Sequence, residues 1–141
     1  MKTVAVPLCL AFFTSPLCCA AESAPEMLSN KLESLAGAGA RNCGSIPLGS
    51  VRSAAVACTK QSLVSGTTFR VALQYQGVDS FVWQGAARDE HGKLWLLSFD
   101  SDPSGGSQTG AVLNETPCTE IEVVAVHGRD EMNCVQSGDE R

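Results

Sequence analysis

The residues whose type and spacing most directly suggest chemistry are four cysteines outside the first 21 residues: Cys43, Cys58, Cys118 and Cys134. An even number of cysteines in a small exported chain is typical of a disulfide framework. Three pairings are possible, and we expect Cys43 with Cys58 and Cys118 with Cys134, because each pair brackets one compact segment. Closing a loop of this length stabilises a fold by roughly 3 kcal/mol in the chain-entropy model. A zinc site is the alternative, but the spacing contains no C-x-x-C pair, so we predict neither a metal nor another cofactor.

The two histidines, His91 and His127, are the next residues that could carry chemistry. A hydrolytic site would need one of them beside a nucleophile and an orienting acid. His91 follows Asp89 and Glu90 in a predicted hairpin turn, and His127 precedes Gly128 at a strand end, so we expect both rings to be exposed. The chain has no nucleophile elbow, metalloprotease motif or phosphate-binding glycine loop. A small exported hydrolase that uses His91 or His127 is therefore an alternative hypothesis, and a non-enzymatic protein is the favoured one.

A third pattern spans residues 100–105, where oxygen side chains and a glycine match the front half of an EF-hand calcium loop. Asp100 and Asp102 would be its first ligands. The twelfth position is Ala111, where an EF-hand requires a bidentate glutamate, and Pro103 restricts the path of the loop. We therefore favour an Asx turn in a connection between strands. A calcium-dependent structural module that uses Asp100 and Asp102 is the alternative.

The first 21 residues have the features of an export signal. A positive start at Lys2 is followed by an apolar run to Phe13, and small residues before Glu22 offer a cleavage site. The run is too short to remain as a transmembrane helix. We therefore expect a periplasmic or secreted protein. The alternative is a lipoprotein processed at Cys18 or Cys19, and only in that case do we expect membrane attachment.

Size and charge limit the functions that the chain could have. Removal of residues 1–21 leaves about 120 residues, enough for one domain with a modest core. The full chain carries a net charge of -5, and loss of Lys2, the only charged residue before Glu22, makes it -6. Nucleic acids and anionic membranes require a positive surface, so neither is an expected partner. An unidentified protein is the partner class that remains.

Composition divides the chain into a signal peptide (1–21), a flexible tether with a short helix (22–41), a single α+β domain (42–136) and a polar tail (137–141). Leucines at helical spacing predict the tether helix from Pro25 to Leu35, and the glycines after it favour a loose connection. In the domain, Ser50 can cap a helix over 51–65 that ends at Gly66. Small residues on one side of that helix would let it approach a sheet closely.

After this helix the apolar period changes to two, which predicts strands over 69–76, 81–87, 95–99 and 120–127. The turn between the second and third of these strands fixes their register. A three-residue loop with Gly92 in the left-handed conformation would pair Ala87 with Trp95. The same register pairs Trp83 with Phe99, so the large aromatic side chains share one face of the sheet.

These elements predict an α+β fold, in which one main helix packs on an antiparallel sheet of about four strands and disulfides stabilise the domain. We expect the helix over 51–65 to cover the aromatic face. The opposite face would then carry an exposed apolar strip made of Val82, Ala86, Leu94 and Leu96. We expect the tether helix, a second copy or another protein to cover that strip.

The function that these features favour is an exported, non-enzymatic binding or inhibitory domain with an unidentified target. Export, small size, disulfides, the missing catalytic motifs and the apolar strip support it.

The calcium alternative leads to a direct test. We expect millimolar calcium to leave the melting temperature of the protein unchanged, because a loop without the twelfth-position carboxylate binds too weakly to stabilise the fold by mass action. Thermal unfolding followed by calorimetry measures this. An increase in melting temperature that disappears in Asp102→Ala would establish a calcium site.

Overall fold

The computed structural model describes residues 24–105 and 110–136. The predicted signal peptide, with Cys18 and Cys19, and the polar tail 137–141 lie outside the described residues. In chain order the elements are α1 (Glu26–Ala36), β1 (Arg41–Ile46), α2 (Ser53–Ser65), β2 (Phe69–Gln76), β3 (Phe81–Arg88), β4 (Leu94–Asp100), β5 (Val112–Cys118), β6 (Glu120–Val126) and β7 (Arg129–Val135).

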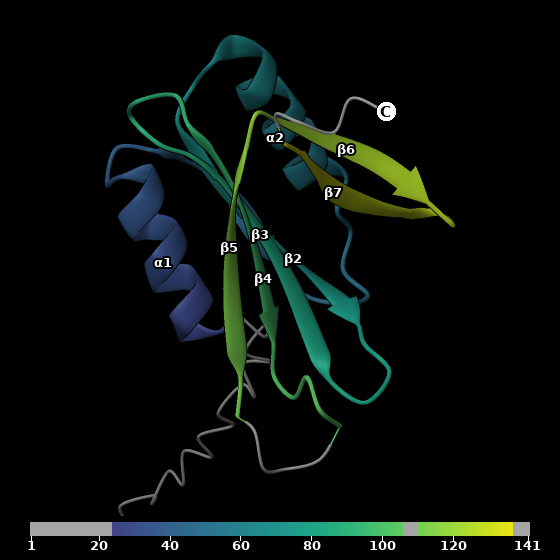
Figure 1. Cartoon of the computed structure of the whole chain (residues 1–141). Coiled ribbons are helices and arrows are strands. Elements are labelled where there is room, and N and C mark those ends of the chain that lie inside the picture. Colours follow the sequence, from purple (N-terminus) through teal and green to yellow (C-terminus); the bar gives the residue numbers. More distant parts are fainter. Residues whose placement is uncertain (1–23, 106–109, 137–141) are drawn as a thin grey trace, which may run out of the picture.

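Five strands form the main sheet in the order β1-β2-β3-β4-β5, and β6 and β7 form a separate two-stranded sheet. β1 runs parallel to β2, and α2 is the connection between them. All other neighbouring strands are antiparallel. Figure 1 shows α1 on one side of the main sheet, with α2 and the β6–β7 hairpin on the other side. The chain is therefore a mixed α+β protein in which the main sheet is the middle one of three layers (Figure 1).

The register of the central hairpin is the one that the sequence predicts. Ala87 pairs with Trp95, and Trp83 pairs with Phe99. The backbone N–H of Asp89 donates to the carbonyl of Lys93 at 3.0 Å, and Gly92 has a φ of 82°. A left-handed residue at the end of a three-residue loop keeps the two strands aligned, and glycine adopts this conformation without strain. The turn and the apolar pattern thus specify the same register.

The aromatic face of the sheet is covered by α1. Leu28, Leu32 and Ala36 lie on one side of this helix and are all buried. They pack on a sheet surface formed by Ala72, Trp83, Ala87, Leu97 and Phe99. α1 approaches β3 closely at Gly85, where a β-carbon would lie 3.0 Å from the leucine side chains of the helix. The glycine thus gives the helix room to seat its leucines on the sheet.

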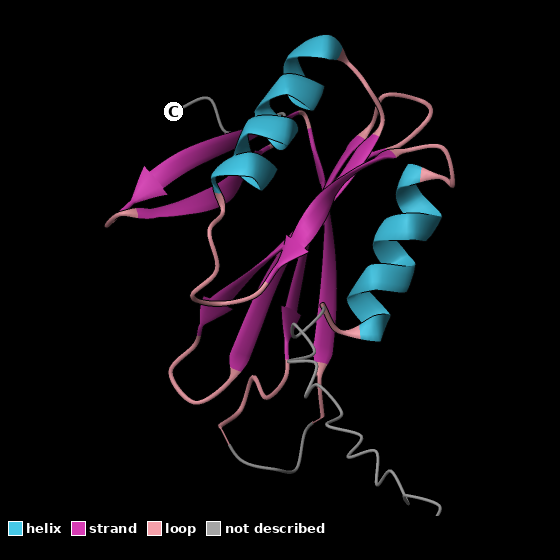
Figure 2. Cartoon of the chain, turned by 180° about the vertical axis from the view of Figure 1, so that it is seen from behind, coloured by secondary structure: helices cyan, strands magenta, loops and turns pink. Residues whose placement is uncertain are grey.

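The opposite face of the sheet is covered by α2 and by the β6–β7 hairpin, which lie next to each other in one layer (Figure 2). The core on this face contains buried residues from seven strands and one helix: Cys43, Ala55, Phe69, Val71, Leu73, Tyr75, Ala86, Leu94, Cys118, Ile121 and Met132. Two hydrogen bonds attach the hairpin to this face. The hydroxyl of Tyr75 donates to the carbonyl of Asp130 at 2.7 Å, and the backbone N–H of Met132 donates to Gln84 Oε1 at 3.2 Å.

The expected assignment of helices to faces is therefore wrong. The strip of Val82, Ala86, Leu94 and Leu96 shares its face with α2, and the helix on the aromatic face is α1. Ala86 and Leu94 are buried by the chain itself. The physical reason is the parallel β1–α2–β2 connection, because such crossovers are almost always right-handed and this handedness decides on which face the helix lies.

Three strands, β1, β5 and β7, and the role of the tether were not predicted correctly. Residues 41–46 form the edge strand β1, for which the sequence pattern predicts no strand, and residues 112–118 form β5 despite Pro117, which an edge strand tolerates. Residues 129–135 form β7, the partner of the predicted strand β6. The tether prediction is wrong for residues 26–36, since α1 is part of the core. The sequence does predict β2, β3, β4 and β6, because the apolar residues of these strands alternate regularly.

The disulfides join the predicted partners. Cys43 is bonded to Cys58 with the Cα atoms 5.5 Å apart, and Cys118 is bonded to Cys134 with the Cα atoms 5.3 Å apart. The first links β1 to α2, and the second links the end of β5 to β7. Disulfides fit an oxidising environment of the kind that exported proteins meet.

The docking of α1 can be tested with two substitutions in one helix. Leu28→Ala should lower the free energy of unfolding by about 2 to 5 kcal/mol, because it empties a fully buried site. Met27→Ala, next to it but 52% exposed, should change it much less. Urea unfolding measures both. Equal effects would mean that α1 is the loose tether that the sequence suggested.

Candidate functional site

A cleft of about 800 Å³ lies between α2 and β6 on the face opposite α1. Lys60, Leu63 and Val64, from the second half of α2, form one wall. Their spacing places them on one side of the helix. Arg88 and Leu94, from the main sheet, form the floor. Ligand sites commonly have volumes of about 300 to 1,000 Å³, so the cleft is large enough to hold a ligand.

The other wall is the edge of β6 rather than one of its faces. Five consecutive residues, Glu120–Val124, line the cleft. Successive side chains of a strand point to opposite faces, so a cavity that contacts every residue in a row must run along the edge of the strand. Main-chain groups of β6 therefore face the cleft.

The β6–β7 turn identifies which main-chain groups these are. His127 and Gly128, with φ values of 48° and 76°, form a two-residue turn between the paired residues Val126 and Arg129. Residues next to such a turn are a hydrogen-bonded pair, and the pairs then alternate along the hairpin. Consequently the N–H and C=O groups of three β6 residues point away from β7, namely Ile121, Val123 and Ala125.

Hydrogen bonds on the far side of β7 support this alternation. Asp130 and Met132 are the partners of Ala125 and Val123. The carbonyl of Asp130 accepts from Tyr75, and the N–H of Met132 donates to Gln84, so both groups point away from β6 as the alternation requires. The outer edge of β7 is thus attached to the main sheet. Over residues 24–105 and 110–136, β6 pairs with β7 alone, which leaves its other edge free.

Two disulfides and a hydrogen bond fix the walls of the cleft. The Cys43–Cys58 bond holds α2 against β1, and the Cys118–Cys134 bond holds the hairpin against the end of β5. Arg88 donates from Nη2 to the carbonyl of Leu63 at 3.1 Å and so attaches the end of α2 to the floor. A ligand would therefore meet a preformed site and lose little free energy in ordering it.

The base of the cleft is apolar apart from Arg88, and its rim carries charges of both signs, with Lys60 on α2 and two glutamates on β6. Leu94 and Ile121 are buried at its base, and Leu63 packs against the same core. At the rim Val64 is 91% exposed, and Glu120 and Glu122 are exposed on β6. A ligand that fits would have apolar groups facing the sheet and polar or charged groups facing solvent.

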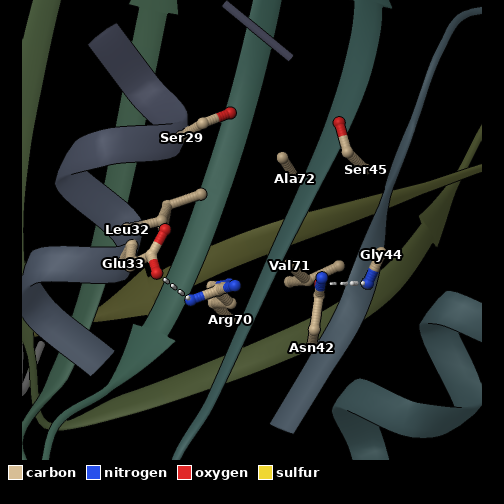
Figure 3. A pocket seen from close by; sticks show the side chains of 9 residues that line it. All are labelled: Ser29, Leu32, Glu33, Asn42, Gly44, Ser45, Arg70, Val71 and Ala72. Carbon is tan, nitrogen blue, oxygen red and sulfur yellow. Dashed lines mark hydrogen bonds and ion pairs between the residues drawn. The ribbon is translucent and has the colours of Figure 1, made fainter. Parts of the chain in front are cut away.

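A second pocket lies between α1 and the β1–β2 edge (Figure 3). It holds only about 140 Å³. Glu33 Oε1 lies 3.7 Å from Arg70 Nη1 at one side, and Asn42 Oδ1 accepts from the N–H of Gly44 at the other. Gly44, with a φ of 109°, belongs to an irregularity in the β1–β2 pairing that opens this space. Its small volume and internal pairs make it a weaker candidate than the cleft.

The histidines lie at two different turns, and both are exposed. His91 shares a surface hollow with Ser34 and Asp89, a set that could suggest a hydrolytic triad. The Asp89 carboxylate, however, accepts the backbone N–H groups of His91 and Lys93, both at 2.9 Å, and its other oxygen accepts from Trp95 Nε1 at 3.2 Å. In the described part of the chain no hydrogen bond joins Ser34 to His91. These contacts stabilise the turn.

The acidic loop after β4 also has a local role. Asp100 Oδ1 accepts the backbone N–H of Asp102 at 3.0 Å, which is the Asx turn that the sequence favours. Among the residues that the structure describes, no group of three or more His, Cys, Asp or Glu side chains could hold a metal ion.

Comparison with known proteins finds no matching family model, no matching curated protein and no matching solved structure. Neither α1 nor α2, the helices of the described chain, has the length and apolar character that crossing a membrane requires.

Sequence reasoning did not find the cleft, although it predicted both elements that form the walls. It placed α2 on the wrong face, and the cleft exists only because α2 and β6 lie beside each other. The useful signal was present in the alternation of Glu120 and Glu122 with Ile121 and Val123, since a strand with one apolar and one acidic face must lie at a surface.

The carboxylate of Asp89 makes stability depend on pH. Burial raises its pKa, but hydrogen bonds from Trp95, Lys93 and His91, with the charge of His91, together lower it below the ordinary value. A lowered pKa in the folded state gives stability that is present above the unfolded-state pKa and is lost as pH falls through the folded-state pKa. Asp89→Asn should therefore be less stable than the wild type at pH 7, with a difference that shrinks in acid. Unfolding measured from pH 7 to pH 2 tests this, and a constant difference would contradict it.

Proposed function

We propose that this protein is an exported, non-enzymatic binding domain that holds a segment of another protein in the cleft between α2 and β6. The observation that carries the proposal is the cleft itself. Its base is apolar apart from Arg88, one wall is a free strand edge, and a disulfide attaches each wall to the main sheet. An inhibitory role would follow if the bound segment belongs to an enzyme.

The exposed apolar surface at the cleft supports this proposal. Val64 is almost fully exposed at the rim, beside Leu63 and above the buried Leu94. Apolar side chains that continue from a core to the surface inside a concave site are typical of binding sites. A rigid site gains affinity because neither wall needs to be ordered by the ligand.

Two valines allow a matched test. Val64 lies at the cleft, and Val78 lies in the β2–β3 connection at another part of the surface; they are 91% and 96% exposed. Neither substitution to arginine should reduce stability noticeably, because neither side chain is buried. Val64→Arg should weaken capture of a partner at least about tenfold, because a charge would be desolvated in the contact, whereas Val78→Arg should leave capture unchanged.

The measurement is quantitative capture from culture supernatant or cell envelope on the immobilised, oxidised chain, compared across wild type, Val64→Arg and Val78→Arg. A partner lost with the cleft variant alone supports the proposal. Absence of any partner that depends on Val64 would contradict it.

A further inference from the structure

We infer that the cleft takes an extended peptide segment, which adds to the free edge of β6 as a third strand of the β6–β7 sheet and alternates apolar and basic side chains. This inference rests on the proposed function and specifies the chemistry of the partner.

The backbone of β6 is the first reason. Ile121, Val123 and Ala125 direct their N–H and C=O groups away from β7, and Glu120–Val124 line the cleft in an unbroken row. An unpaired row of this kind is a template for another strand, and main-chain hydrogen bonds then supply affinity without regard to sequence. A compact ligand would leave most of these groups unpaired.

The two faces of the added strand would meet different surroundings. Side chains directed toward the main sheet would contact Leu63, Leu94 and Ile121, and the Arg88 guanidinium beside them already donates to the carbonyl of Leu63, so apolar residues fit there. Side chains directed outward would lie beside Glu120 and Glu122 on β6. Opposite charges on neighbouring strands attract, so lysine or arginine fits these positions. A net charge of -5 for the whole chain also favours a basic partner.

A second copy of the chain is a poorer occupant than such a peptide. Pairing β6 with β6 of another molecule would bring Glu120 and Glu122 of both copies to the same face of one sheet. Glu131 of β7 adds to this acidic face, because it is the partner of Val124. Like charges on adjacent strands destabilise the pairing. Charge complementarity therefore favours a basic peptide over self-association.

The test uses the oxidised wild-type chain and a synthetic seven-residue peptide in which valine and lysine alternate, with blocked ends. We expect saturable binding by calorimetry. Two further peptides carry N-methyl groups on alternate residues. One is methylated at its valines and the other at its lysines. N-methylation at alternate residues removes the hydrogen-bond donors on one edge of the peptide and blocks strand pairing there. One of the two peptides should therefore lose more than about tenfold in affinity, and the other should bind as the unmethylated peptide does.

Amide exchange locates the bound peptide on the chain. The amides of Ile121, Val123 and Ala125 should become protected on binding, whereas those of Glu122 and Val124, which already face β7, should not change. The double variant Glu120→Lys with Glu122→Lys should weaken the valine–lysine peptide about tenfold, and Glu131→Lys, on the neighbouring strand, should have a smaller effect.

Two outcomes would overturn strand addition: no binding of the valine–lysine peptide, or equal effects of N-methylation in the two N-methylated peptides. Equal binding of a valine–glutamate peptide would overturn the preference for basic side chains. If the same amides become protected as the protein concentration rises, without any peptide, the free edge of β6 pairs with a second copy of the chain instead. If these peptides fail while partner capture still depends on Val64, the binding function stands and only the mode of binding is wrong. If capture fails as well, the proposed function is also wrong.

Discussion

The central strands are apolar on both faces, and the rest of the molecule is arranged to cover them. Trp83, Leu97 and Phe99 face one side, while Phe69, Val71 and Leu94 face the other. A sheet of this kind is stable in water only when both faces are covered, because large apolar side chains otherwise remain hydrated. α1 covers the first face. The second needs two elements, α2 and the β6–β7 hairpin, because the residues that α2 buries are small and the helix covers little area by itself.

The cleft follows from this division of the second face. A helix and a two-stranded hairpin that share one layer cannot hydrogen-bond to each other as strands do, so the edge of β6 next to α2 stays unpaired. The hairpin uses its other edge to bond Tyr75 and Gln84 of the main sheet. The disulfides then fix α2 and the hairpin separately, each to the sheet, and neither bond closes the space between them.

This arrangement connects stability with the proposed function. An unpaired strand edge is normally an aggregation hazard that proteins reduce with charge or with a covering element. Here the glutamates of β6 and the neighbouring helix restrict access to it. The same features that protect the edge from unspecific pairing would select a segment narrow enough to fit beside α2 and basic enough to lie next to Glu120 and Glu122.

The sequence by itself determined the local features. Both helices, the β3–β4 register, the β6 strand, the disulfide partners and the Asx turn at Asp100 follow from periodicity, turn residues and spacing, which act over short distances along the chain. The tertiary structure alone decided which helix covers which face and where the cleft lies. The reason is β1, a six-residue strand with little apolar periodicity: its parallel pairing with β2 is a long-range contact, and the handedness of the crossover that it begins places α2 beside β6.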